Sequence, residues 1–215
     1  MMTRVFKRLP VLFLCLVCCR VPAFSQAVDL GLSVKWASCN VGASYPEEAG
    51  DYFAWGEVST KHDYSLRTYR WSKMSTNVLL KYNVNSALGK EDGRTELELR
   101  DDAAHVLMGG TYRIPTTAEW TELHEKCRWI WTFRNGVAGY EVESPKTGRS
   151  IFLPAAGFRC NTMFFSVGAL GVYWTSSLSV DYPDHAQYVL FYGSFFELNS
   201  YFRYYGQSIR AVQPY

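Results

Sequence analysis

The stretch from Arg113 to Leu123 constrains this chain most, because it carries the signals with which a helix begins. The hydroxyl of Thr116 can accept a hydrogen bond from the backbone N–H of Glu119, and the Glu119 carboxylate can reach back to the N–H of Thr116. Such a capping box satisfies two of the donors that a helix start leaves without partners. Pro115 cannot lie inside a helix, so it fixes where the extended lead-in stops.

An apolar stripe follows the capping box at helical spacing and consists of Trp120, Leu123 and Cys127. We therefore expect a helix from Thr117 to about Cys127, with Trp120 buried against a sheet. A second apolar pattern predicts another helix over Thr95–Met108, because the glycine pair that follows it would end the helix.

Residues 1–25 have the composition of a signal peptide, which does not belong to the folded protein. Basic residues come first, a short apolar run follows, and small residues then predict cleavage between Ser25 and Gln26. The end of the apolar run also resembles a lipobox, so a lipoprotein anchored through Cys19 is the alternative. Both alternatives predict an exported chain (periplasmic, surface-bound or secreted) without a transmembrane span.

The predicted signal peptide also accounts for the formal net charge of +2. It holds four of the 22 basic residues and none of the 20 acidic ones, so the rest of the chain has a net charge of −2. Binding to nucleic acid usually needs a basic surface, and we expect no nucleic acid partner. Hydrophobic residues make up 48% of the chain, which is enough for one domain with a substantial core.

Three cysteines follow the predicted signal peptide: Cys39, Cys127 and Cys160. An exported protein can form disulfides, but an odd number of cysteines leaves at least one thiol free. A bond between Cys39, on an early strand, and Cys127, on the helix, is one possibility. Buried free thiols are the other, because cysteine often behaves as a small core hydrophobe.

Alternating apolar residues and turn signals predict strands around the two helices. The pair Asn135-Gly136 predicts a hairpin. The polar residues 59–94 show no clear period, which predicts a long surface loop. Further strands are expected as a pair within residues 27–43 and at residues 150–154, 172–176, 187–192, 195–199 and 207–212. Two helices packed on a twisted, mainly antiparallel sheet place the chain in the α+β class.

Seven segments spread over the chain carry a resemblance: Val28–Ala37, Gly50–Glu57, Arg113–Leu123, Asn135–Tyr140, Ile151–Gly157, Tyr173–Ser177 and Ser208–Val212. The third is similar to the R-[LI]-P-T-x-A-E-W helix of the formylglycine-generating (sulfatase-modifying) branch of the C-type lectin fold. Together they resemble more closely the Fibrobacter succinogenes major paralogous domain proteins, which Bacteroidales export in many copies. The resemblance implies a single, loop-rich C-type lectin-like domain over residues 26–215, with its last strand beside its first.

The window from Tyr182 to Tyr205 is unusually aromatic, because ten of its 24 residues are Tyr or Phe and none is Lys. Surfaces rich in Tyr, Ser, Gly and Asn are typical of antibody paratopes. In a strand only alternate residues can face the core, so neighbouring rings such as Phe195 and Phe196 must point to different faces or lie in loops. We therefore expect much of this window to face solvent; the alternative is that most of these rings are ordinary sheet and core aromatics.

The same window resembles the variable region of diversity-generating retroelement target proteins, which also use a C-type lectin fold. In those proteins adenine-directed mutagenesis yields Tyr, Ser, Asp, His, Phe and Asn at surface positions. The resemblance implies these candidate ligand-binding residues: Asp181, Tyr182, Asp184, His185, Tyr188, Tyr192, Ser194, Phe196, Asn199, Tyr201, Phe202 and Tyr204.

Catalysis and bound cofactors are not predicted. Formylglycine-generating enzymes use a pair of cysteines near the C-terminus, and no cysteine follows Cys160 here, so that activity is not carried over. The four histidines lack metal-ligand spacing, and the chain has no nucleophile-elbow, zinc-protease or P-loop motif. The calcium triplets E-P-N and Q-P-D of sugar-binding lectins are also missing. Asp101 and Asp102 could bind calcium, although paired acids on a helix are usually solvated.

Three interpretations remain open at this point. The first is an exported, non-enzymatic protein that binds a protein or glycan at or beyond the cell surface. The second is a structural or adhesive component of a surface assembly, and the third is an enzyme of the sulfatase-modifying type. A transient binding face predicts a soluble monomer, whereas a permanent interface predicts an oligomer.

Overall fold

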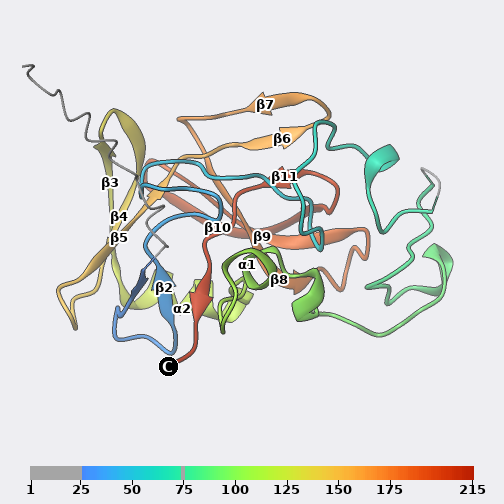
Figure 1. Cartoon of the computed structure of the whole chain (residues 1–215), viewed down its shortest axis with the longest axis horizontal. Helices are drawn as coiled ribbons and strands as arrows, with labels where there is room; N and C mark the ends of the chain where they lie inside the picture. Colours follow the sequence, from blue (N-terminus) through green and yellow to red (C-terminus); the bar gives the residue numbers. More distant parts are fainter. Residues whose placement is uncertain (1–25, 74–75) are drawn as a thin grey trace, which may run out of the picture.

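The computed structural model describes residues 26–73 and 76–215 (Figure 1). The predicted signal peptide and the lipoprotein alternative at Cys19 lie outside these residues. The described part is α+β, with two α-helices and mostly antiparallel sheets. None of its helices is long and apolar enough to cross a membrane.

The helix predicted after Pro115 is present as α2 (Thr117–Lys126), with Cys127 as its C-cap. Its capping box is confirmed. The Thr116 hydroxyl accepts from the N–H of Glu119 at 3.3 Å, and the N–H of Thr116 donates to the Glu119 carboxylate at 2.8 Å. The helix therefore begins where the local sequence alone placed it.

The strands of the described residues form four three-stranded sheets with the orders β1-β2-β12, β3-β4-β5, β11-β6-β7 and β10-β9-β8. All pairings between these strands are antiparallel. The strands are β1 (Ala27–Val28), β2 (Lys35–Ala37), β3 (Arg128–Arg134), β4 (Val137–Glu143), β5 (Ser150–Pro154), β6 (Phe158–Cys160), β7 (Met163–Phe165), β8 (Gly171–Leu178), β9 (His185–Tyr192), β10 (Phe195–Phe202), β11 (Gly206–Gln207) and β12 (Val212–Gln213). The single sheet expected from the sequence is thus divided into four small ones.

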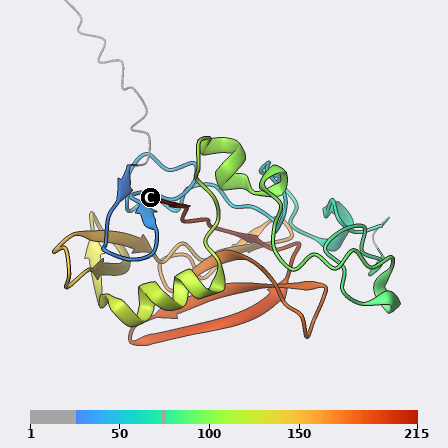
Figure 2. The same cartoon turned by 90° about the horizontal axis from the view of Figure 1, so that it is seen from below.

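Helix α2 lies alongside the sheet β10-β9-β8 (Figure 2). Trp120 is fully buried, and its ring centroid lies 4.8 Å from that of Trp36 on β2 and 5.7 Å from that of Tyr173 on β8. Burying aromatic rings of this size removes a large apolar area from water. Trp120 therefore joins the helix, the N-terminal strands and the central sheet in one core, as the apolar stripe predicted.

The second helix is shorter than predicted. The sequence pattern indicated Thr95–Met108, but α1 comprises Ala103–Met108 and is preceded by the 3₁₀ turn η3 (Leu99–Asp101). Glu96 instead forms an antiparallel bridge to Ser177, which keeps this part of the chain extended. The Asp102 side chain accepts from the N–H of His105 at 3.0 Å and so starts the helix after the extended part.

The C-terminal segment closes the fold, as the resemblance implied. β12 pairs with β2, with Val212 opposite Trp36, so the two ends of the described chain lie together (Figure 1). The continuous strand predicted over residues 207–212 is not present, because it is divided into β11 and β12. Between them the backbone carbonyls accept from several segments instead of one strand, and the buried side chain of Arg210 donates to backbone carbonyls.

The remaining predictions differ in outcome. The hairpin at Asn135-Gly136 is confirmed, with φ angles of 48° and 82° between β3 and β4. The described residues between 59 and 94 (59–73 and 76–94) belong to a long excursion that contains the 3₁₀ turns η1 (Leu66–Thr68) and η2 (Ser86–Leu88). No disulfide joins the three cysteines of the described chain, so of the two alternatives the bond between Cys39 and Cys127 is not present.

Candidate ligand-binding groove

The central sheet β10-β9-β8 has two faces of different character. Directly opposed residues of antiparallel strands share a face. Tyr173, Val189, Phe191 and Leu198 face α2 and belong to the main core; we call this the helix face. Their neighbours Val172, Tyr188, Leu190 and Tyr201 point the other way, onto what we call the groove face.

The groove face borders a hollow of about 230 Å³. On one side it is lined by side chains of the central sheet, and on the other by the sheet β11-β6-β7 and the segments next to it. We call this hollow the aromatic groove; its lining residues are Phe158, Leu170, Val172, Tyr188, Leu190, Tyr201, Tyr205 and Gln207. Three tyrosines and one phenylalanine give it flat apolar walls, and none of its lining side chains is charged.

Gln207 adds an amide to the three tyrosine hydroxyls of this groove. It is 2% exposed, and its amide oxygen has no hydrogen-bond partner among the described residues. A buried polar atom without a partner is costly unless a ligand or water satisfies it. The oxygen is itself buried, so the groove as it stands offers it no partner.

None of the twelve candidate residues is buried. Half of them are exposed: Asp181, Tyr182, Tyr192, Ser194, Asn199 and Tyr201. The other half are partly buried: Asp184, His185, Tyr188, Phe196, Phe202 and Tyr204. Three of them, Tyr188, Phe196 and Tyr204, nevertheless pack against clusters of the core.

Four of the candidates lie on the groove face. Tyr188 and Tyr201 line the aromatic groove, and Tyr192 and Asn199 extend from the same face of β9 and β10. The rings of Tyr201 and Tyr205 are 4.9 Å apart. Burial raises the pKa of Tyr188, and negative charge at Glu197 adds to this effect. Its hydroxyl therefore stays protonated at neutral pH, and can donate or accept a hydrogen bond.

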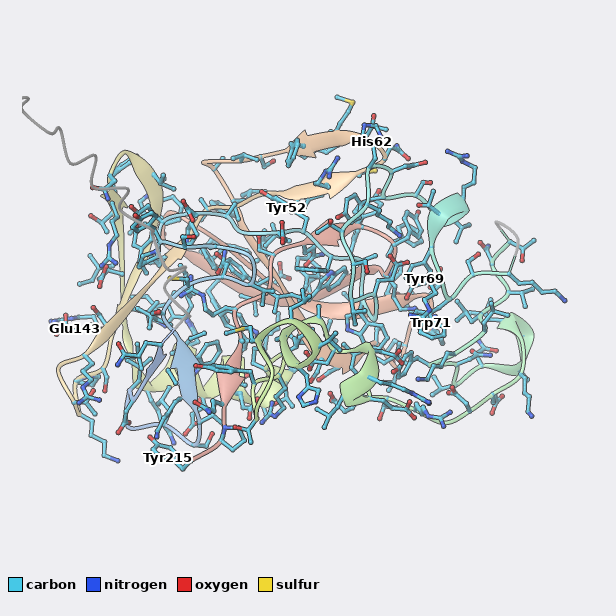
Figure 3. All side chains as sticks on the ribbon, viewed as in Figure 1. Tyr52, His62, Tyr69, Trp71, Glu143 and Tyr215 are labelled. Carbon is cyan, nitrogen blue, oxygen red and sulfur yellow. The ribbon has the colours of Figure 1, made fainter. Side chains whose placement is uncertain are left out.

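A second hollow, of about 190 Å³, gathers three more candidates. Asp184, Phe202 and Tyr204 line it together with residues of the long excursion, among them Tyr69 (Figure 3). The rings of Phe202 and Tyr204 stack at 5.2 Å. The rings of Tyr201 and Phe202 lie 5.5 Å apart, so the second hollow adjoins the aromatic groove.

The connection between β8 and β9 forms the edge of this aromatic region. Tyr182 lies 5.4 Å from the ring of His185, which in turn contacts Phe202 at 4.5 Å. Burial lowers the pKa of His185, and the positive charge of Arg203 acts in the same direction against the opposing charge of Asp184. His185 is therefore mostly neutral at pH 7. Asp181 precedes Tyr182 and is exposed.

Two candidates lie away from the groove. Phe196 is on the helix face, where its ring stacks on His124 of α2 at 3.8 Å. Ser194 lies in the turn between β9 and β10. The twelve residues thus do not form one continuous surface, which is a correction to the single aromatic face expected from the sequence.

Sequence reasoning missed several residues that line the aromatic groove: Phe158, Leu170, Val172, Leu190, Tyr205 and Gln207. Tyr205 is one of the aromatic residues of the window, so the argument from aromatic composition could have included it. Phe158 precedes the window, on a strand that only the tertiary fold brings opposite β9. Among the described residues no group of three metal-ligating side chains comes together, and Asp101 is instead hydrogen-bonded to Lys81 and Tyr82.

Comparison of the chain with models of protein families, with curated proteins and with solved structures found no match. The site is therefore interpreted from its own geometry.

Proposed function

We propose that this chain is an exported, non-enzymatic binding protein that holds its ligand in the aromatic groove. The observation that carries the proposal is the aromatic groove itself, a hollow walled by four aromatic side chains in which three tyrosine hydroxyls are polar groups. Small sites of this kind combine apolar walls with a few polar groups that orient the ligand. The ligand would be a protein or glycan at or beyond the cell surface that presents a flat apolar group next to a hydrogen-bond donor.

We also propose that the scaffold is a C-type lectin-like domain related to the Fibrobacter succinogenes major paralogous domain proteins. Two features support this: the capped helix α2 starts within the most specific matching segment, and the matching segments at the two ends meet in the pairing of β2 with β12. A related enzyme of the sulfatase-modifying type is disfavoured by the missing cysteines after Cys160. A structural role remains the second candidate, favoured by the exposed β6–β7 hairpin described below.

Arrays of bacterial surface glycans and of purified surface proteins would test the binding function. We expect the wild-type chain to bind a defined subset, and Tyr201→Ser to weaken binding at least about tenfold, because truncating an aromatic contact at the centre of a binding site commonly costs about 2 kcal/mol. Tyr45→Ser is the matched control, since Tyr45 is also exposed but lies outside the groove. Equal binding by both variants would show that the groove is not the site.

The proposal that the window is diversified needs a different test. Deep sequencing of the locus across cells of one strain would be combined with a search for a nearby template repeat and reverse transcriptase. Substitutions confined to residues 178–205 at adenine-bearing codons would support diversification. A uniform sequence without a template would leave a binding protein of fixed specificity.

A further inference from the structure

The β6–β7 hairpin carries an apolar patch at the periphery of the molecule. β7 is an outer strand of its sheet, with β6 on one side and no strand of the described chain on the other (Figure 1). Met163, Phe164 and Val167 are 60%, 56% and 57% exposed, and Phe165 is 37% exposed. Successive residues of a strand point to opposite faces, so β7 presents apolar side chains to solvent on both of its faces.

The size of this patch is that of a protein interface rather than of scattered surface residues. A large aromatic side chain carries about 200 Å², so the four exposed side chains together leave about 400 Å² of apolar surface, divided between the two faces of β7; exposed apolar surface of this order marks interaction sites on soluble proteins. A standard stable interface buries about 800 Å² on each partner, a little more than half of it apolar. The patch can thus supply most of the apolar part of such an interface.

The charges around the patch would not keep two copies apart. Free edge strands are usually protected by charged residues or proline, but residues 157–170 contain one charged side chain, Arg159. Its guanidinium lies 4.5 Å from the ring centroid of Phe164 and donates to the carbonyls of Lys61 and His62 at 3.2 and 3.0 Å. It is therefore engaged within its own molecule.

A second edge strand shows the contrast. β3 is the outer strand of the sheet β3-β4-β5 and also exposes a phenylalanine, Phe133, which is 69% exposed. Arg128 and Arg134 stand at its two ends, each paired with a glutamate of β4 at 2.7 Å. β3 thus has the charges that protect an edge, and β7 does not.

We propose that β7 of one copy pairs antiparallel with β7 of a second copy across a two-fold axis. Such an interface sets the same surface against itself, so that Phe164 lies opposite Phe164, and Met163 lies opposite Phe165. The two sheets β11-β6-β7 would become one continuous sheet. Ser166 has a φ of 55° and ends the strand, so the short pairing predicts a weak, concentration-dependent dimer in place of the monomer expected from the sequence.

The pairing would bring two aromatic grooves close to one interface. Phe165 stacks on Phe158 at 5.3 Å, and Phe158 lines the groove. A ligand that repeats along a surface could then engage both grooves, which raises apparent affinity without new contacts. This consequence rests on the proposed function, whereas the dimer itself does not, so the test below needs no ligand.

Sedimentation velocity of the purified protein at about 1 to about 100 μM would test the pairing. A weak interface of this size dissociates within that range of concentration. We expect a monomer at the lower end and a dimer at the upper end. Phe164→Lys should raise the dissociation constant at least about tenfold, because it places two ammonium groups opposite each other. Phe133→Lys, the same change on the edge strand β3, should leave the dimer intact.

Two outcomes would overturn the proposal: a monomer at all concentrations, or a dimer that Phe133→Lys dissociates and Phe164→Lys does not. Met163→Glu, at a more exposed position of the same strand, provides a second variant should Phe164→Lys fail to fold. Hydrogen exchange of the wild-type protein at low and high concentration would locate the interface independently. Added protection should be confined to the β6–β7 hairpin, and protection confined to another strand would also count against β7.

Discussion

At the scale of single residues, Thr116 shows how one hydroxyl fixes the start of α2. Its side chain satisfies the N–H of Glu119, which would otherwise have no partner in the first turn. We expect Thr116→Ala to lower the free energy of unfolding by about 1 kcal/mol, measured by urea denaturation. Thr116→Ser keeps the hydroxyl and should stay close to wild type; a loss of equal size in both variants would mean that packing, rather than the cap, matters there.

Glu119 adds a dependence on pH to the same helix start. Burial alone would raise its pKa, but the hydrogen bonds from Arg113 and from the N–H of Thr116 outweigh burial and hold the pKa below its ordinary value of 4.5. Because the pKa is lower in the folded state, the ionised carboxylate stabilises the fold above pH 4.5. This contribution is lost as the pH falls through the folded-state value.

Glu119→Gln removes this pH dependence and therefore serves as its test. The variant should be less stable than wild type at pH 7, since Arg113 loses its partner at 2.8 Å. The difference in urea midpoint between the two proteins should shrink as the pH falls from about 7 to about 3. A difference that stays constant over this range would show that the carboxylate charge does not stabilise the helix start.

Residues that act on near neighbours in the sequence were the ones that sequence reasoning could assign. The partners Thr116 and Glu119 are three positions apart, so helix geometry alone brings them together. Gln207 has no such local signal, because several residues that line the groove with it, such as Phe158 and Tyr188, are far from it in the sequence. Sequence reasoning therefore identified the aromatic window, but of the residues that line the groove it named only Tyr188 and Tyr201 as candidates.

At the scale of elements, the turn between β3 and β4 has the most specific local requirement. Gly136 has a φ of 82°, and a side chain there would meet no atom within 4 Å, so the cost of substitution is purely conformational. We expect Gly136→Ala to lower the free energy of unfolding by about 1 kcal/mol. Gly136→Asn should cost less, because asparagine tolerates the left-handed region better. Equal losses in urea denaturation would contradict this explanation.

Elements set by tertiary contacts were predicted less well than turns and caps. The apolar pattern over Thr95–Met108 is helical, yet Glu96 is held extended by its bridge to Ser177. A helix there would lose that bridge and the hydrogen bond from Ser177's neighbour, Ser176, to the Glu96 carboxylate at 2.7 Å. Helix propensity is weak enough for such contacts to override it.

At the scale of the whole molecule, Arg210 joins three distant parts of the chain. It is fully buried, and it donates to the Asn40 side chain at 2.8 Å, to the carbonyls of Ala37 and Ser38 at 3.0 and 2.8 Å, and to the Phe152 carbonyl at 2.8 Å. Its partners come from the N-terminal segment and from β5, and Arg210 itself lies between β11 and β12. Burial lowers the pKa of Arg210, but these neutral acceptors still solvate its charge.

The backbone around Arg210 shows why the last predicted strand is interrupted. A continuous ladder over residues 207–212 would need each backbone group to pair with one neighbouring strand. The carbonyls of this segment instead accept from the N–H groups of different segments, those of Phe53, Trp174, Val41 and Ala37. The sequence shows an arginine between apolar neighbours, but it does not show which carbonyls lie around it.

The exchange of Arg210 for lysine should therefore be far from conservative. One ammonium group cannot reach all four acceptors on two segments, so buried carbonyls lose their donors. We expect Arg210→Lys to lower the free energy of unfolding by about 3 kcal/mol, which for a chain of this size corresponds to a fall of about 6 to 12 °C in Tm. Arg67→Lys is the control, because the Arg67 side chain is 74% exposed and pairs with one carboxylate at the surface. A fall in Tm no larger for Arg210→Lys than for this control would mean that the segments are held together by packing alone, and that the guanidinium is not what closes the fold.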